Sequence, residues 1–209
     1  DPDVIELMNS ELPVVTIDYV HHNCSAISSN NIQGIEELVK YIYSQGHRKI
    51  AYIHGQEGST VTRDRLASFY RTMDELGLHV SDKYVRTANY LETRGAAEQT
   101  GQLLDLPDPP TCIIYPDDTS LIGGRNVIFE RGMKIPQDIS VAGYDGTQIS
   151  QILYPKLTTI KQNTELIGEE AAIRLVGAIE KPKTTLVERV VIEGNLVRGQ
   201  SVGMIQVDE

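Results

Sequence analysis

The sequence predicts an α/β protein in which parallel sheets are flanked by helices. Short runs rich in β-branched residues alternate with longer segments whose apolar residues recur at helical spacing. Glycine or proline closes several of these segments, as at Gly46, Gly132 and the pair Pro109 and Pro110. Strict alternation of strand and helix is typical of parallel sheets that are covered on both faces and connected by right-handed crossovers.

The first half of the chain establishes this pattern. A short helical stretch at 4–9 leads into an expected strand at 13–18. A helix is expected at 32–44 because apolar residues share one face and Gly46 follows as a stop. The pattern then repeats, with a strand at 49–54, a helix at 62–76, a β-rich run at 84–88 and a helix at 93–104.

The second half continues in the same way. After the turn at 108–110, a strand is expected at 111–115 and a helix at 120–131. An apolar run that ends at Gly143 predicts a buried strand at 140–142, and 157–160 is a second short β-prone run. The last elements are a helix at 165–180 and a strand region at 186–197. The inner face of that helix is expected to carry Ile167, Ala171, Leu175 and Ile179.

Composition excludes several classes of function. The 209 residues carry a formal net charge of −10, and no cluster of Lys and Arg offers a surface for nucleic acid. No apolar run approaches the roughly 20 residues of a membrane helix. The two cysteines, Cys24 and Cys112, are far apart and form no metal-binding or redox spacing, which is typical of reduced thiols in a cytoplasmic protein. We therefore expect no membrane contact, no metal and no cofactor.

The stretch from Val141 to Gln162 is the most informative part of the sequence. An apolar run, a Gly-Tyr-Asp-Gly turn and a β-prone run follow one another without a break. Asp145 falls at the carboxyl end of the expected strand, which is where open α/β sheets present ligand-binding side chains. The alternative role of Asp145 is that of a turn-forming residue before Gly146. This stretch predicts a sugar-type binding cleft.

Further fragments along the chain carry a family resemblance. They are Leu12-Pro13-Val14-Val15, Asn30-Asn31 with Gly34, Gly46-His47-Arg48-Lys49-Ile50-Ala51, Arg63-Asp64-Arg65-Leu66-Ala67 with Phe69, Pro110-Thr111, Asp117-Asp118, Gly132 to Gly146, Leu157-Thr158-Thr159-Ile160, Gly168 with Ala171-Ala172, and Leu196-Val197-Arg198. In this order and spacing they resemble the effector-binding core of the lac repressor and galactose repressor family of bacterial transcription regulators. The resemblance covers nearly the whole chain.

The resemblance implies a periplasmic-binding-protein-like fold of two α/β lobes that bind a small molecule between them. Residues 1–45 and 162–183 would form a partial N-terminal lobe, and residues 46–161 and 184–209 the C-terminal lobe. In the family, the point at which this chain begins lies well inside the N-terminal lobe. We therefore expect that lobe to be incomplete, and the DNA-binding helix-turn-helix to be absent from this chain.

The resemblance also assigns the candidate ligand-binding residues, which are Arg65, Asp145, Asp117, Tyr90, Gln162 and Asn30. A guanidinium such as that of Arg65 can donate two parallel hydrogen bonds to vicinal hydroxyls or to a carboxylate, and its alternative is a solvated or ion-paired arginine. Tyr90 would stack on a sugar ring, or else belong to the core. Asp118 is expected to cap the helix that follows it.

The predicted function is that of the effector-binding and dimerisation core of a regulator of this family. A small molecule, most simply a sugar, would control operator binding through the missing headpiece, and the intact regulator would be a cytoplasmic homodimer. A sugar-binding protein of a transporter is the alternative, since it would share the fold and the cleft. An enzyme is disfavoured because the sequence contains no GxSxG, HExxH, P-loop or GxGxxG motif in the required context.

Overall fold

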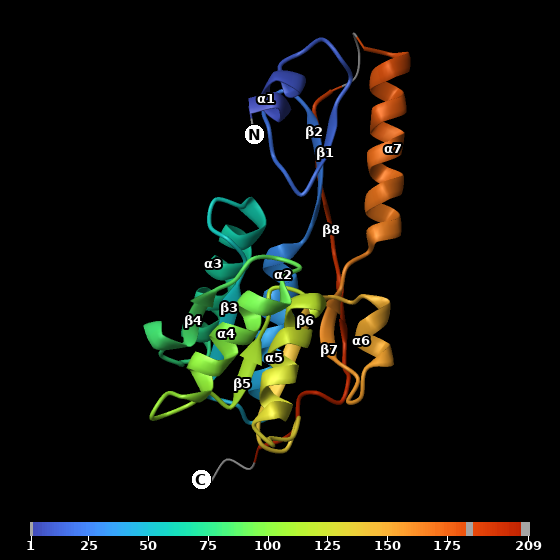
Figure 1. The fold of residues 1–209 in the computed structure, drawn as a ribbon. Coiled ribbons are helices and arrows are strands. Elements are labelled where there is room, and N and C mark those ends of the chain that lie inside the picture. Colours follow the sequence, from blue (N-terminus) through green and yellow to red (C-terminus); the bar gives the residue numbers. More distant parts are fainter. Residues whose placement is uncertain (1, 183–185, 206–209) are drawn as a thin grey trace.

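The computed structural model describes residues 2–182 and 186–205, and their strands form two sheets of unequal size (Figure 1). The larger sheet has six strands in the order β4-β3-β5-β6-β7-β9, and only the β7 and β9 pair is antiparallel. Its strands are β3 (Ile50–His54), β4 (Val85–Thr87), β5 (Cys112–Ile114), β6 (Ser140–Asp145), β7 (Thr158–Lys161) and β9 (Asn195–Val197). The predicted α/β class with parallel sheets flanked by helices is confirmed.

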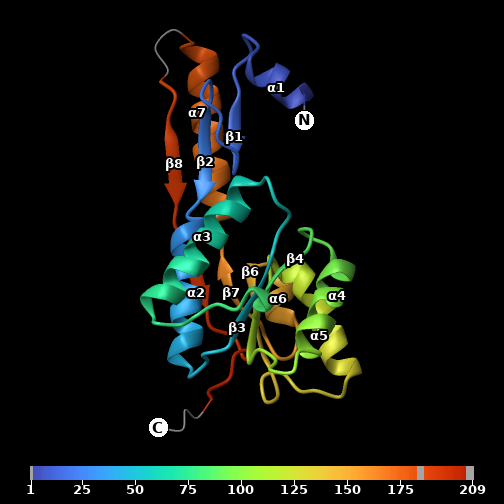
Figure 2. The same ribbon diagram turned by 90° about the vertical axis from the view of Figure 1, so that its left-hand side faces the viewer.

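Helices cover both faces of the larger sheet (Figure 2). Its helices are α2 (Asn31–Ser44) and α3 (Thr60–Glu75) on one face, and α4 (Thr93–Leu104) and α5 (Asp118–Glu130) on the other. Every residue of β3 is buried, as expected for a parallel strand between two helical layers. This double-sided core fixes the carboxyl ends of the strands on one rim of the sheet, and Asp145 ends β6 there.

The smaller sheet has three parallel strands in the order β1-β2-β8. These are β1 (Val15–Ile17), β2 (Ser25–Ser29) and β8 (Arg189–Ile192), with α7 (Thr164–Glu180) packed alongside them (Figure 1). Their buried apolar cluster is small, with Ile27, Ile167 and Ile192 at its centre. The inner face expected for α7 is only partly right, because Ile167 is buried but Ile179 is 60% exposed.

The chain passes between the two sheets at three places among the described residues. These are the β2-to-α2 junction at 29–31, the β7-to-α7 junction at 161–164 and the β8-to-β9 junction at 192–195. The lobe boundaries expected from the sequence differ at two points. Helix α2 packs in the core of the larger sheet rather than with residues 1–29, and β8 pairs with β2 of the smaller sheet rather than with the larger one. The expected boundary near 183 lies outside the described residues.

Most expected elements are present within a few residues of their predicted limits. Strand β2 and the short helix α6 (Gln148–Ile152) were not expected, and the strand region at 186–197 divides into β8 and β9, which belong to different sheets. The short helix α1 (Pro2–Met8) and a 3₁₀ turn, η1 (Asp82–Tyr84), complete the order. No helix within the described ranges is long and apolar enough to cross a membrane.

Candidate ligand-binding site

Arg65 lies at the centre of the candidate site. It projects from α3 and is only 3% exposed. Its Nε donates to Asn31 Oδ1 at 2.7 Å and its Nη1 donates to the Pro116 carbonyl at 2.9 Å. The remaining nitrogen, Nη2, lies 4.0 Å from Asp145 Oδ1, which is longer than a hydrogen bond. Two nitrogens therefore anchor the guanidinium, and the third faces the Asp145 carboxylate across a short gap.

Asp145 reaches this position through an unusual backbone conformation. It ends β6 with a φ of 96°, in the left-handed half of the map that non-glycine residues rarely adopt. Its Oδ1 accepts a hydrogen bond of 2.6 Å from Gln162 Nε2. Burial raises the pKa of Asp145, while the charge of Arg65 and the hydrogen bond from Gln162 oppose the rise. Asp145 thus lies beside both Arg65 and Gln162, as a binding pair would require.

Aromatic rings enclose the guanidinium. The carbon Cζ of Arg65 lies 3.5 Å from the ring centre of Tyr144 and 5.9 Å from that of Tyr90. Both distances are within the range of cation–π attraction. The Tyr90 hydroxyl shares a hydrogen bond of 2.9 Å with Thr62, and its ring packs so closely on Gly55 that a Cβ there would lie 2.1 Å from the ring. Tyr90 is therefore fixed beside Arg65, and its stacking on a ligand stays a prediction.

Asp117 is engaged by protein donors on both of its oxygens. It is 1% exposed, and its carboxylate accepts from the Ser120 backbone N–H at 2.7 Å, the Ser120 hydroxyl at 2.8 Å and the Leu91 backbone N–H at 2.9 Å. It is the N-cap of α5, so the expectation that Asp118 caps this helix was wrong. Asp118 lies one residue further, inside the first turn, where its side chain is directed elsewhere. Asp117 nevertheless lies close enough for its charge to raise the pKa of Asp145.

Asn30 is placed differently from what its candidate role suggests. Its side chain caps α2 by accepting from the Gln33 backbone N–H at 3.1 Å. The neighbouring Asn31 is the residue whose side chain contacts Arg65. Sequence reasoning noted both asparagines but chose the first. A ligand contact by Asn30 stays a prediction.

The smaller sheet contributes residues that sequence reasoning missed. Asp18 has a φ of 55°, its carboxylate accepts from the Ser29 backbone N–H at 3.1 Å, and its carbonyl accepts from the Thr60 hydroxyl of α3 at 3.1 Å. The buried hydroxyls of Ser29, on the smaller sheet, and Tyr144, on the larger, lie near each other where the two sheets meet. Polar groups at this position are available to a polar ligand. The sequence signal for Asp18 was its position at the end of the expected strand 13–18, and Ser29 had none because β2 was not expected.

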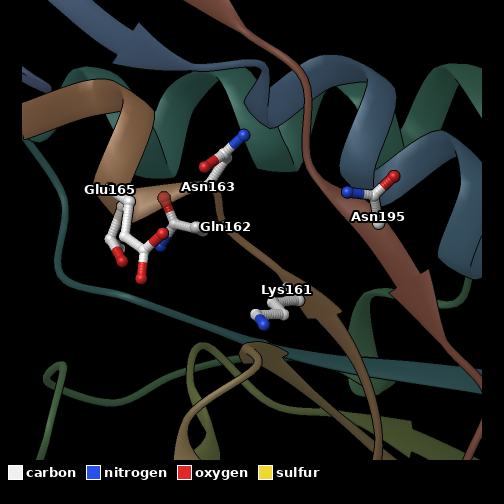
Figure 3. A pocket seen from close by; sticks show the side chains of 6 residues that line it. Lys161, Gln162, Asn163, Glu165 and Asn195 are labelled. Atoms are coloured by element: carbon white, nitrogen blue, oxygen red, sulfur yellow. The ribbon is translucent and has the colours of Figure 1, made fainter. Parts of the chain in front are cut away.

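Two hollows border the site on the α7 and α6 sides. An open one of about 1030 Å³ includes Asp145, Gln162 and Lys161 in its lining. A smaller one of about 270 Å³ is shown in Figure 3, where Gln162 and Asn163 lie at the start of α7 and Asn195 projects from β9. Gln162 therefore lines both hollows and also donates to Asp145, which is consistent with the cleft position expected for it.

The chemistry of the site suits recognition of polar groups. It combines a fixed guanidinium, a carboxylate, an amide and aromatic faces. Within residues 2–182 and 186–205, no group of three or more His, Cys, Asp or Glu side chains is arranged to bind a metal ion.

Comparison with known proteins identifies the family of this fold. The model of the periplasmic binding protein-like domain family matches residues 39–202. The probable HTH-type transcriptional repressor ExuR of Bacillus subtilis (strain 168) is 32% identical over 176 residues, which are 84% of this chain and 53% of that protein. The HTH-type transcriptional repressor CytR of Escherichia coli (strain K12) is 31% identical over 170 residues, 81% of this chain and 46% of that protein. The chain thus spans about half the length of the curated relatives it matches.

Solved structures extend the similarity to the whole fold. The LacI transcriptional regulator from a Rhodococcus species is 28% identical with a TM-score of 0.87, over 97% of this chain and 74% of that one. The resemblance to regulators of the lac and galactose repressor type is confirmed by these relatives. Because the family model spans most of its length, the chain belongs to the periplasmic binding protein-like domain family.

Proposed function

We propose that this chain is the effector-binding and dimerisation core of a LacI-type transcription regulator. A small molecule, most simply a sugar, binds where the two sheets meet, and operator DNA is bound by a headpiece outside this chain. The curated relatives are named as repressors, which favours this function over a sugar-binding protein of a transporter or an enzyme. A cytoplasmic location and a homodimer of the intact regulator are parts of the proposal.

The observation that carries the proposal is the gap between Arg65 and Asp145. The two charged groups face each other at 4.0 Å, so they attract without forming a direct hydrogen bond. A ligand hydroxyl placed about 2.8 Å from both atoms would accept from the guanidinium and donate to the carboxylate. The side chain of Asp145 is 28% exposed and that of Arg65 only 4%, so a ligand would meet Asp145 first.

The proposed mechanism is a shift of population. A ligand that contacts groups of both sheets binds best when the sheets have one particular relative orientation. It changes the affinity for operator DNA only to the extent that it binds two orientations with different affinity. Asp18 and Ser29 on the smaller sheet, and Arg65 and Asp145 on the larger, are placed to make this difference.

A calorimetric and thermal-shift screen tests the proposal directly. The chain is titrated with D-ribose, other pentoses and hexoses, sugar acids and nucleosides. A ligand at about one hundred times its dissociation constant raises the free energy of unfolding by about 2.7 kcal/mol, which moves the midpoint by several degrees. Arg65→Lys retains the charge but not the planar pair of donors, and Asp145→Asn retains the shape but not the charge.

We expect each of these variants to weaken binding at least about tenfold, because a charge-assisted hydrogen bond contributes about 1.5–3 kcal/mol. Arg94→Lys is the matched control, since Arg94 is an exposed residue of α4 that forms an ion pair with Glu98. No binding to any compound of the panel, or binding that both site variants retain, would refute a small-molecule site at this position. Sedimentation of the intact regulator as a monomer at micromolar concentration would refute the dimer.

A further inference from the structure

The turn that follows β6 has a conformation that needs external support. Asp145 and Gly146 adopt consecutive positive φ angles of 96° and 65°. Gly146 is required here, since a Cβ would lie 2.4 Å from the Cα of Lys161. Asp145 has a Cβ, so its backbone carries a conformational strain of order 1–3 kcal/mol. Something in the surrounding structure must stabilise this turn.

Asp118 provides that support through its contacts with Thr147 and Thr159. Its Oδ2 accepts from the Thr147 backbone N–H at 2.8 Å and from the Thr147 hydroxyl at 2.9 Å. The Thr147 hydroxyl is thereby diverted from capping α6, whose N-cap it would otherwise serve. Asp118 is 0% exposed, and a Cβ on Gly143 would lie 2.3 Å from its Oδ1, so β6 also depends on a glycine at that position.

Thr159 of β7 connects the second oxygen of Asp118 to the same turn. Its hydroxyl donates to Asp118 Oδ1 at 2.8 Å and accepts from the Gly146 backbone N–H at 3.3 Å. The backbone N–H groups of Gly146 and Thr147 are therefore bound, one through Thr159 and one directly, by a single buried carboxylate. No other function is evident for this carboxylate, because it does not cap α5.

We propose that Asp118, acting through Thr147 and Thr159, is the positioning residue that fixes the turn after β6 and so directs the Asp145 carboxylate toward Arg65. It does not touch the ligand. The consequence for ligand affinity rests on the proposed function, whereas the effect on the turn does not. The alternation of a strand would point Tyr144 and Asp145 to opposite faces, and the left-handed turn allows both to lie near Arg65.

The first test uses the ligand-free chain and isosteric changes at Thr159. Thr159→Val removes the hydroxyl, Thr159→Ser retains it, and Asp118→Asn replaces an acceptor oxygen by a donor. Thr158→Val is the matched control, because the buried hydroxyl of Thr158, on the adjacent residue of β7, accepts only from the Gly199 backbone N–H at 3.1 Å. Amide hydrogen exchange of Gly146 and Thr147 is followed by NMR in every variant.

We expect the Gly146 amide, which loses its hydroxyl acceptor, to exchange up to about tenfold faster in Thr159→Val, and the Thr147 amide, which loses a carboxylate acceptor, to exchange at least about tenfold faster in Asp118→Asn. Thr159→Ser and Thr158→Val should exchange like the wild type. Unchanged exchange in Thr159→Val and Asp118→Asn, or an equal acceleration in Thr158→Val, would show that the network does not fix the turn.

A second measurement separates positioning from general loosening. The carboxyl carbon of Asp145 is titrated by NMR in the wild type, Thr159→Val and Thr159→Ser. Burial raises the pKa of this carboxyl, the charges of Asp117 and Asp18 add to the rise, and Arg65 and Gln162 oppose it. If Thr159→Val lets Asp145 move away from Arg65, both the burial and the attraction change, so the pKa of Asp145 departs from the wild-type value and Thr159→Ser restores it. An unchanged pKa in Thr159→Val would overturn the proposal.

The consequence for binding is tested with D-ribose by calorimetry. Thr159→Val should bind it at least about tenfold more weakly than Thr159→Ser, since a misplaced carboxylate loses its charge-assisted hydrogen bond. Equal affinities would overturn the link to binding. Absence of D-ribose binding by the wild type would remove D-ribose from the candidate ligands of the proposed function, while the exchange and titration results would still decide the positioning role.

Discussion

At the scale of single residues, two adjacent pairs divide their roles in a way that the sequence does not reveal. Asp117 caps α5 and Asp118 supports the turn after β6, although the sequence suggested that Asp118 was the cap. Asn30 caps α2 while Asn31 contacts Arg65. A shift of one residue at a helix start rotates a side chain by about 100° around the axis, so neighbours face different partners. Residue type was sufficient to identify the two pairs, but not to decide which member of each pair caps the helix.

The buried carboxyl of Asp118 gives the protein a measurable pH dependence. Burial raises its pKa from 3.8 to about 6, the charge of Asp145 adds to the rise, and the hydrogen bonds from Thr159 and Thr147 oppose it. The folded state therefore binds this proton more tightly than the unfolded state. The contribution of Asp118 to the free energy of unfolding is most favourable below about pH 4 and falls by about 3 kcal/mol as the pH rises through 6.

Urea unfolding of the wild type and of Asp118→Asn, repeated from pH 4.5 to pH 7.5 in about half-unit steps, isolates the contribution of Asp118 together with its coupling to Asp145, because titrating groups that do not interact with Asp118 cancel in the difference. The wild type should lose stability relative to the variant as the pH rises toward 6, and the difference should be constant above about pH 7. A difference that is flat over the whole range would contradict the raised pKa.

At the scale of elements, the N-terminus of α5 is expected to be sensitive to substitution. Asp117→Ala removes the acceptor for three donors, two buried ones from Ser120 and a part-buried one from Leu91. We expect it to lower the free energy of unfolding by at least about 2 kcal/mol, since a cap contributes about 1 kcal/mol and each unsatisfied buried donor costs about as much again.

The matched comparison for this prediction is Asn163→Ala at the start of α7. The side chain of Asn163 accepts from the Leu166 backbone N–H at 3.3 Å in an exposed setting, so the loss of this side chain should cost under about 1 kcal/mol. Both values come from urea unfolding at neutral pH. Equal losses at the two caps would mean that burial adds nothing to the role of Asp117.

Elements with strong local patterns could be predicted from the sequence, and those without them could not. Strand β3 is a continuous apolar run and α2 has an apolar face, and both were expected within two residues of their limits. Strand β2, Ser-Ala-Ile-Ser-Ser, has one large apolar residue and forms because β1 and β8 bind its backbone on either side. Pairing of distant strands leaves no local signal in so polar a segment.

At the scale of the whole molecule, the fold class could be predicted but the membership of each sheet could not. Residues 186–197 indicated a strand region, yet the chain enters the smaller sheet as β8 and leaves for the larger sheet as β9. The turn at Glu193 and Gly194 is too short to identify a passage between lobes. Four candidates from the sequence, Arg65, Asp145, Tyr90 and Gln162, lie together in the structure. The residues that the smaller sheet contributes were not expected, because the sequence does not show which strands form that sheet.

The unequal cores of the two sheets predict unequal local stability. The larger sheet is buried between two extensive apolar clusters, while the smaller one has three buried isoleucines and a few partly buried neighbours. Amides of β1, β2 and β8 should therefore exchange through openings of lower free energy than those of β3, β5 and β6. Native-state hydrogen exchange measures this difference. Helix α2, which follows β2 directly, is the internal control and should be protected like the larger sheet.

Protection that declines gradually along the chain, without a step between β2 and α2, would contradict this expectation. A step at that junction would mean that the smaller sheet can open while the larger sheet stays folded.

The three passages between the sheets also constrain how such a protein can be altered by recombination. The smaller sheet is assembled from residues before 30 and from residues between 164 and 192, and these enclose most of the larger sheet in the chain. No contiguous stretch of coding sequence therefore specifies either unit. A single crossover between related genes that falls between β3 and β7 would divide both sheets between the two parents, because β1, β2 and β3 lie before it and β7, β8 and β9 after it.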